Sequence, residues 1–485
     1  MPLILPGNVA SALPTGFSVD NSCRFNDGDT PYFSKSFGTP SDGKKWTFSC
    51  WVKGGDLGND APNSDRNLIG ARIDSSNYTD LRYLALDRHM YWLDYTSGAA
   101  HEGRVEPRKL RDPAAWMHHV WACDTTQGTP ANRMKFYING VDQGSLLVGA
   151  WGSYPDEDDE LTMNKSGATV DVGRSPAGYY YWDGYMAEVV FIDGTQYAAS
   201  DFGEYDEDSP TIWKPKKVST LTFGNNGFYL DFKDSANLGN DANGGTDLSE
   251  NNIAAVDQCM DSPTNNFCVM NPLDNYRFAG TFSEGNCHVV SSSSNYAYTT
   301  GTMGMTAGKY YWEVEFDAQS SSGDYSRIGF AGVMSTGNAE LGSQTHNYAY
   351  YGVNGNGYYN GSNADLGTTY TVGDIISVAL DLDNLKVYYA KNGTWVNSGD
   401  PTSGATGTGA QTVLAASTTP IGAYLPALNY VDSSITGTWK CNFGGCSAFT
   451  VSSANSDGNG YGNFEYAVPS GYLALCTKNL GSDGG

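Results

Sequence analysis

Positive charge is scarce in this sequence. Its 485 residues include 28 lysines and arginines against 53 aspartates and glutamates, so the formal net charge is −25 at pH 7. A protein that binds nucleic-acid phosphates or an anionic membrane surface needs clustered lysine and arginine side chains on its surface. We therefore expect no nucleic-acid partner and no attachment to such a membrane.

Long apolar runs are also missing. No stretch approaches the ~20 apolar residues that a membrane-spanning helix needs, so we expect no membrane insertion. Residues 1–17 carry no basic segment ahead of their short apolar patch, which Pro2 and Pro6 interrupt. Such a start is not typical of a secretory signal. We expect synthesis in the cytoplasm, with residues 1–15 as an extended N-terminal arm.

The features of disulfide scaffolds and helical bundles are lacking as well. The nine cysteines are dispersed and odd in number, which argues for free thiols rather than a disulfide framework. Helix-forming runs are few, while 59 glycines, 33 tyrosines and 11 tryptophans indicate turns and strands. The expected fold class is all-β.

Alternation of apolar residues supports this class in both halves of the chain. Residues 46–52 (WTFSCWV) place every second side chain on one face, and residues 134–143 predict a hairpin around an Asn-Gly turn. In the second half, residues 310–316 alternate in the same way. A further pair of predicted strands, 375–382 and 385–390, leads to an Asn-Gly step.

The second half resembles a SPRY domain. Three motifs occur in the order of that family: GKYYWEVEF at 308–316, IGFAGV at 328–333 and VALDLDNLKVYYAKNG at 378–393. The resemblance covers about residues 274–478. It implies a bent β-sandwich that binds ligands through surface loops and has no enzymatic activity.

The first half resembles a laminin-G-like domain of the concanavalin-A-like jelly-roll type. The motifs FSCWVK, HHVWACD, KFYINGV and DGYMAEVVFIDG follow one another between residues 48 and 194. The expected architecture is therefore two tandem antiparallel β-sandwiches, a jelly roll at 16–204 and a SPRY-like sandwich at 274–478. We expect an irregular connector at 205–273 and a C-terminal tail at 479–485.

The motif order along nearly the whole chain resembles tailed-phage virion proteins, particularly of marine phages. Shared elements are PLILPGNVAS near the start, then WTFSCWVK, GFYLDF, DSPTNNF, the SPRY unit and a closing VPSGYLALCTKNL. The resemblance implies a structural virion protein that contacts other virion proteins. We expect a tail-fibre or surface-appendage component that binds host-surface glycans. Phage fibres as a class also suggest a homo-oligomer, such as a trimer.

Two aromatic clusters in Gly- and Asn-rich surroundings are the candidate ligand-binding residues. Aromatic faces beside amides and hydroxyls suit a neutral glycan, through CH–π contacts and directional hydrogen bonds. The alternative, that these rings are core positions of strands, stays open. The candidates are Tyr179, Tyr180, Tyr181 and Trp182 in one cluster, and Tyr348, Tyr350, Tyr351, Tyr358 and Tyr359 in the other.

Acidic residues supply two weaker candidates. Asp27 and Asp29 could give oxygen ligands to calcium, which laminin-G-like domains often hold at the rim, or they form a solvated acidic loop. Glu313, Glu315 and Asp317 alternate along one strand, like the paired carboxylates of some glucanases. Their order does not match that enzyme class, so we expect a solvated strand face and no catalytic residues.

Glycan receptor binding is thus the function we expect, without an enzymatic activity and without a cofactor other than calcium. The first alternative is a purely structural capsid-decoration or adaptor protein. The second is a polysaccharide depolymerase, which needs a cleft with paired carboxylates that the sequence does not indicate.

Overall fold

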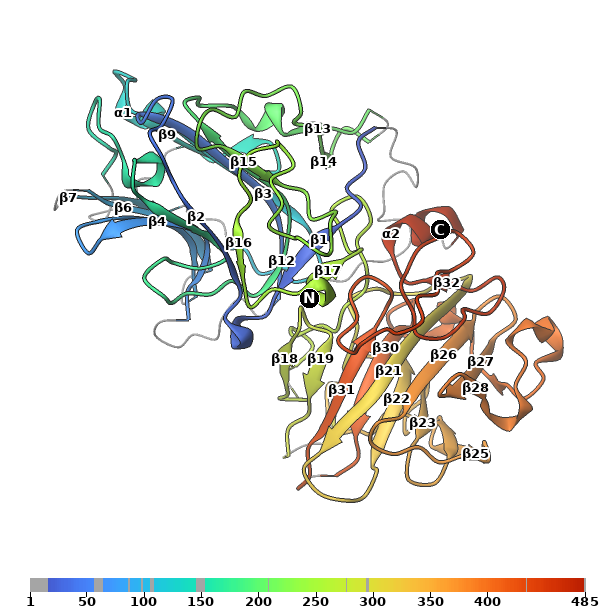
Figure 1. Cartoon of the computed structure of the whole chain (residues 1–485). Helices are drawn as coiled ribbons and strands as arrows, with labels where there is room; N and C mark the ends of the chain where they lie inside the picture. The colour runs from blue at the N-terminus through green and yellow to red at the C-terminus, as the bar shows by residue number, and fades with distance from the viewer. Residues whose placement is uncertain are drawn as a thin grey trace. The chain divides into compact units, whose positions relative to one another are not determined.

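The computed structural model divides the chain into two compact units, one of Pro14–Thr264 and one that contains Asn265–Gly485. Nearly all their regular elements are β-strands (Figure 1). In the part of the chain described, no helix is long and apolar enough to cross a membrane. The described residues are 16–55, 64–85, 88–96, 99–104, 109–144, 153–207, 209–275, 277–293, 296–432 and 434–483.

The first unit is a sandwich of two antiparallel sheets. Side chains of both sheets share one core, with Trp46 and Trp121 from one sheet and Leu81 and Trp92 from the other. One sheet runs in the order β10 (Val141–Asp142), β9 (Met134–Ile138), β8 (Met117–Asp124), β3 (Lys45–Gly54), β12 (Gly184–Asp193), β1 (Ser22–Phe25) and β17 (Gln258–Cys259), with β15 (Phe228–Leu230) also paired to β12. The other runs in the order β16 (Ser249–Asn251), β2 (Tyr32–Ser36), β11 (Thr169–Val172), β4 (Arg66–Asp74), β5 (Asn77–Leu84), β6 (His89–Thr96) and β7 (Ala99–Arg104).

Local sequence explains the elements that alternation predicted. In β3, Trp46, Phe48, Cys50 and Val52 all point into the core, as expected from their spacing. The predicted hairpin is β9 and β10, joined at Asn139-Gly140 with φ of 47° and 78°. Two positive φ values in succession are what a type I′ turn requires, and Asn-Gly adopts them at little cost.

Residues 205–273, expected to form a connector, are divided between the two units. Up to Thr264 they belong to the first unit: β15 pairs with β12, β16 with β2 and β17 with β1 (Figure 1). Short apolar stretches in this region complete the first core, which explains why they cannot be a free linker. Among them are Phe228, Leu230, Phe232, Leu238 and Leu248.

The second unit is also built from two sheets, antiparallel except for one short parallel pair, β21 with β32. The larger has the order β18 (Thr281–Ser283), β19 (His288–Val290), β31 (Gly437–Asn442), β21 (Lys309–Gln319), β26 (Ile375–Asp381), β27 (Lys386–Lys391) and β28 (Thr394–Trp395), with β29 (Gln411–Thr412) beside β27 and β32 (Leu473–Ala474) beside β21. The smaller has the order β20 (Tyr298–Thr300), β30 (Leu425–Tyr430), β22 (Ser326–Ala331), β23 (Asn347–Tyr351), β24 (Asn356–Tyr359) and β25 (Ser362–Asp365).

Strand β21 organises the second core, but it is covered on both faces over half its length. Trp312, Val314 and Phe316 lie in the core, as their alternation predicted. On the opposite face Tyr311 and Glu313 are also buried. The expectation of a solvated face is therefore wrong at Glu313, because residues near 464–466 fold back over this end of the strand.

The expected C-terminal tail is part of the folded unit. Helix α2 (Thr477–Asp483) covers most of residues 479–485. Leu480 lies in the core, and the Asn479 amide donates to the Asp457 carboxylate at 2.7 Å. The expected N-terminal arm, residues 1–15, lies outside the described residues.

Candidate functional site

The second aromatic cluster, in β23 and β24, is mostly core. Tyr348 and Tyr350 are 2% and 0% exposed, and Tyr348 stacks on Phe330 at 4.9 Å between ring centroids. These two rings have no face open to a ligand. Tyr359 is half-buried and stacks on Tyr348.

Tyr351 and Tyr358 have a different partner. Arg327 places its guanidinium over both rings, at 4.5 and 4.3 Å from their centroids. The guanidinium also pairs with Glu340 at 2.9 Å, and Arg327 itself is buried. This arrangement fastens β22 to β23 and β24, so its plain role is structural.

The first aromatic cluster lies in a tightly folded loop that packs on the sheet containing β4 and β5. Trp182 is fully buried in the core, while Tyr179 is 47% exposed and Tyr180 and Tyr181 are half-buried. The Tyr180 carbonyl accepts a hydrogen bond from the backbone of Asn67 in β4 at 2.8 Å. The structure thus buries one of the four candidates and presents the other three at the surface.

Two arginines hold these tyrosines against the sheet. The guanidinium of Arg82, from β5, lies 4.6 Å from the Tyr180 ring and 5.2 Å from the Tyr91 ring of β6. Arg174 lies 3.3 Å from the ring of Tyr32 in β2 and 5.9 Å from that of Tyr181. Each guanidinium therefore joins a loop tyrosine to a strand tyrosine by cation–π contacts.

Carboxylates neutralise both arginines. Arg174 donates from Nε to Asp171 at 2.8 Å. Arg82 lies 3.4 Å from Asp65 and 3.7 Å from Asp80, and burial raises the pKa of the Asp80 carboxyl. Each arginine is consequently held between two tyrosine rings by its ion pairs. Because these carboxylates neutralise its charge, it offers little attraction to an anionic ligand.

The strands carry further rings on the same side. Tyr78 stacks on Tyr95 at 5.5 Å, and the Tyr91 hydroxyl donates to Glu102 of β7. Burial is the first cause that raises the pKa of the phenols of Tyr78, Tyr91 and Tyr180, so they stay neutral and remain hydrogen-bond donors. We name this surface the tyrosine–arginine face: Tyr32, Tyr78, Arg82, Tyr91, Tyr95, Arg174, Tyr179, Tyr180 and Tyr181.

Only the loop part of this face is evident from the sequence. Its strand part lies in β2, β5 and β6, where alternation does mark the sheet side: in β5, Leu81 and Tyr83 point into the core and Tyr78 and Arg82 point outward. That pattern was a usable signal. The pairing of Arg82 and Arg174 with particular rings depends on strand order and could not be read from spacing.

The candidate calcium ligands have other partners. Asp27 pairs with Arg66 at 2.8 Å, and Asp29 accepts from the Asn26 side chain at 2.9 Å. Across the described residues, no group of three acidic, histidine or cysteine side chains is placed to hold a metal ion. Within that part of the chain, the two aspartates are therefore not joined by a third acidic, histidine or cysteine side chain.

The three alternating carboxylates of β21 lie in different surroundings. Glu313 is buried and fully hydrogen-bonded, whereas Asp317 pairs with Lys440 at 2.6 Å and Glu315 lies 4.0 Å from the same ammonium. Burial is the first cause that raises the pKa of both glutamates. Two of the three carboxylates thus share one lysine, and the third is enclosed.

Comparison with known proteins places one family in the second unit: residues 309–411 match the SPRY domain. Ran-binding protein 10 of Danio rerio is 29% identical over 130 residues, which are 25% of this chain and 21% of that protein. The chain thus spans about a fifth of the length of this relative.

Solved structures give low overall similarity. The human HERC1 SPRY domain has 16% identity and a TM-score of 0.24, over 33% of this chain and 89% of that one. A Bacteroides ovatus protein described as carbohydrate-binding has 15% identity and a TM-score of 0.31, over 48% of this chain and 59% of that one.

Proposed function

We propose that this chain is a non-enzymatic binding protein that recognises neutral glycans through the tyrosine–arginine face. One observation carries the proposal: several tyrosine rings are fixed side by side by ion-paired arginines, with Tyr179 turned to solvent. Sugar rings stack their C–H faces on aromatic rings and bond their hydroxyls to phenols and carboxylates. Rings that are already immobilised lose little entropy when a ligand arrives.

The balance of charge supports a neutral ligand rather than an anionic one. Asp65, Asp80 and Asp171 accompany the two arginines of the face, and the whole chain carries a net charge of −25. A sulfated or uronic acid polymer would meet repulsion. Neutral hexose or N-acetylhexosamine chains would not be repelled.

We further propose that this recognition takes place on the surface of a tailed-phage particle, in a tail fibre or similar appendage. The support is the motif order that resembles tailed-phage virion proteins. Immunogold electron microscopy of purified particles, with antibody against this chain, tests the location. Label on tail or appendage agrees with the proposal; particles that contain no such chain would exclude it.

Binding is tested on a glycan array followed by calorimetric titration of the strongest hit. Tyr179→Ala should lower the affinity for that glycan about tenfold. Stacking on one exposed aromatic ring contributes roughly 0.5–1.5 kcal/mol, and the hydroxyl that orients the sugar is lost as well.

Tyr205→Ala is the matched control. Tyr205 is 45% exposed in the same unit, but it packs on Trp213 and lies outside the face. Equal losses for the two variants, or no array signal for any neutral glycan, would remove the basis of the proposal.

A further inference from the structure

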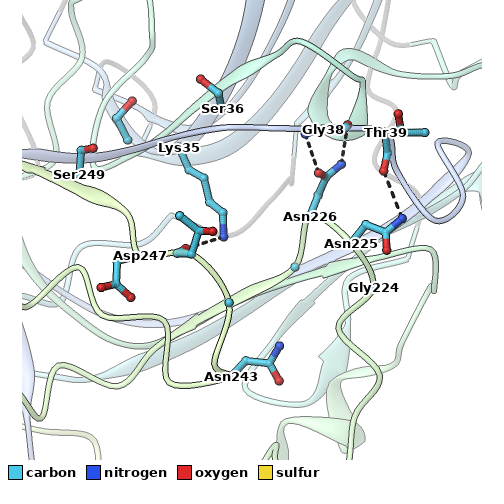
Figure 2. A pocket seen from close by; sticks show the side chains of 14 residues that line it. Lys35, Ser36, Gly38, Thr39, Gly224, Asn225, Asn226, Asn243, Asp247 and Ser249 are labelled. Carbon is cyan, nitrogen blue, oxygen red and sulfur yellow. Dashed lines mark hydrogen bonds between the residues drawn. The ribbon is translucent and has the colours of Figure 1, made fainter.

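The first unit also contains a pocket of about 640 Å³ beside β2 and β16 (Figure 2). Three segments line it, within residues 34–39, 224–227 and 243–249, and none of the lining side chains is aromatic. Hydroxyls, amides and glycine backbone predominate, with one lysine and one aspartate. Its size lies in the range of small-molecule sites, roughly 300–1,000 Å³.

One wall of the pocket is fixed by two neighbouring asparagines. Asn226 is buried; its side chain accepts from the Gly38 N–H at 2.9 Å and donates to the Gly38 carbonyl at 3.2 Å (Figure 2). Asn225 donates from its side chain to the Thr39 carbonyl at 3.3 Å. The Asp193 carboxylate accepts both asparagine N–H groups, at 3.0 and 3.1 Å. This wall is formed before any ligand arrives.

The opposite wall has an internal cation. Lys35 donates to the Thr246 carbonyl at 2.8 Å, and its ammonium lies 3.6 Å from the buried carboxylate of Asp241. Asp241, Asn243 and Asp247 have the one-three-seven spacing that calcium loops use. Because the Lys35 ammonium occupies the Asp241 carboxylate, and both Asp247 oxygens accept hydrogen bonds from within the loop, a divalent cation is not the ligand that the pocket suits.

Several polar side chains of the lining make no side-chain hydrogen bond within the described part of the chain. They are neutral and solvent-facing, so they are free to donate to and accept from a ligand. The Asp247 carboxylate at the rim opposes an anionic ligand. The free groups are the hydroxyls of Ser36, Thr39, Thr246 and Ser249 and the amide of Asn243.

We propose that this pocket is a second saccharide site, which binds one neutral sugar unit by hydrogen bonds and without calcium. Hydroxyl and amide groups on several sides match the ring of hydroxyls on a hexose. The absence of an aromatic ring from the lining distinguishes its chemistry from that of the tyrosine–arginine face. The inference extends the proposed function to a separate place on the first unit, and each site can fail without the other.

The test is saturation-transfer NMR on the full chain with methyl glycosides of glucose, mannose, galactose and N-acetylglucosamine. The pocket variant is Asn243→Ala with Ser249→Ala. We expect it to weaken the best glycoside about tenfold, since each lost hydrogen bond contributes roughly 0.5–1.5 kcal/mol. The matched control is Asn132→Ala with Ser200→Ala, two exposed residues of the same types outside the pocket.

The outcomes separate the two sites. If the pocket variant loses glycoside binding while Tyr179→Ala and the control variant retain it, the result supports a saccharide site in the pocket. Loss only in Tyr179→Ala overturns the pocket and leaves the tyrosine–arginine face standing. Binding that disappears with EDTA and returns with calcium overturns the calcium-independent site. No transfer to any of the four glycosides in the wild-type chain also overturns it.

Discussion

At the scale of single residues, burial decides what a carboxylate does in this protein. One oxygen of Glu313 accepts from the Tyr311 hydroxyl at 2.8 Å and the Tyr466 N–H at 2.9 Å. The other accepts from the Glu465 N–H at 2.9 Å and the Asn442 amide at 3.3 Å. Glu313 therefore fastens the segment at 465–466 to strand β21.

Glu313→Gln should destabilise the fold by about 2–3 kcal/mol. Either orientation of the new amide points an NH₂ group at a backbone N–H, and an unsatisfied buried donor costs about 1–3 kcal/mol. Urea unfolding measures the change. Glu315→Gln, on the same strand but half-buried beside Lys440, serves as control and should stay within about 0.5 kcal/mol. Equal tolerance at both positions would mean that Glu313 is not a fastening point.

Glu188 predicts a pH dependence of stability. It is 5% exposed, accepts from the Tyr229 hydroxyl at 2.6 Å, and burial raises its pKa from 4.5 to about 7. The native state therefore binds this proton more tightly than the unfolded state. The stability that Glu188 contributes is complete below its unfolded pKa and is lost as pH rises toward 7.

Glu188→Gln removes this dependence because its side chain does not ionise. The free energy of unfolding of wild type minus that of the variant should fall by about 3 kcal/mol between about pH 4 and about pH 8, from roughly 1.4 kcal/mol per pKa unit. Denaturant titrations at several pH values measure it. A difference that stays flat, or grows with pH, would refute the assignment.

At the scale of elements, alternation of apolar residues predicted strands such as β3, β9 and β26, although only β9 alternates in burial and the other two are buried along nearly their whole length. It failed where a loop covers the second face, as at Glu313, because the covering residues are about 150 positions away. For the candidate site, the clustering of aromatic residues in the sequence indicated Tyr179 and its neighbours but not Tyr78 or Tyr91. Their role depends on which strands become neighbours, which local spacing does not encode.

The loop that carries Tyr179–Tyr181 depends on a glycine in β4. A Cβ at Gly70 would lie 2.5 Å from Pro176 of the loop and 2.7 Å from the Asp80 carboxylate. Gly70→Ala should therefore lift the loop, cost about 1–3 kcal/mol of stability and weaken glycan binding about as much as Tyr179→Ala does.

Gly128→Ala is the control, since no atom lies within 4 Å of its added Cβ. Thermal unfolding and titration with the array hit measure both effects. Unchanged stability and binding in Gly70→Ala would show that the loop does not rest on β4 as described.

At the scale of the whole molecule, the two units should each fold alone when cut at the observed boundary. Residues 14–264 contain both sheets and the full first core, while 14–204 lacks β15, β16 and β17 and with them Phe228, Leu230 and Leu248. Phe232 and Leu238 of the same core are lost with them, and each large core side chain removed costs about 2–5 kcal/mol.

Calorimetry tests this boundary. We expect one cooperative transition for 14–264 and one for 265–485, and none for 14–204. A cooperative 14–204 fragment as stable as 14–264 would restore the boundary expected from the sequence.

The central claim, glycan recognition by the tyrosine–arginine face, is tested most directly by a crystal structure of the full chain with the strongest neutral oligosaccharide from the array. We predict a sugar ring in contact with Tyr179 or Tyr180 and sugar hydroxyls bonded to phenols or carboxylates of the face. Sugar density found only elsewhere, with the rings of the face bare, would contradict the claim.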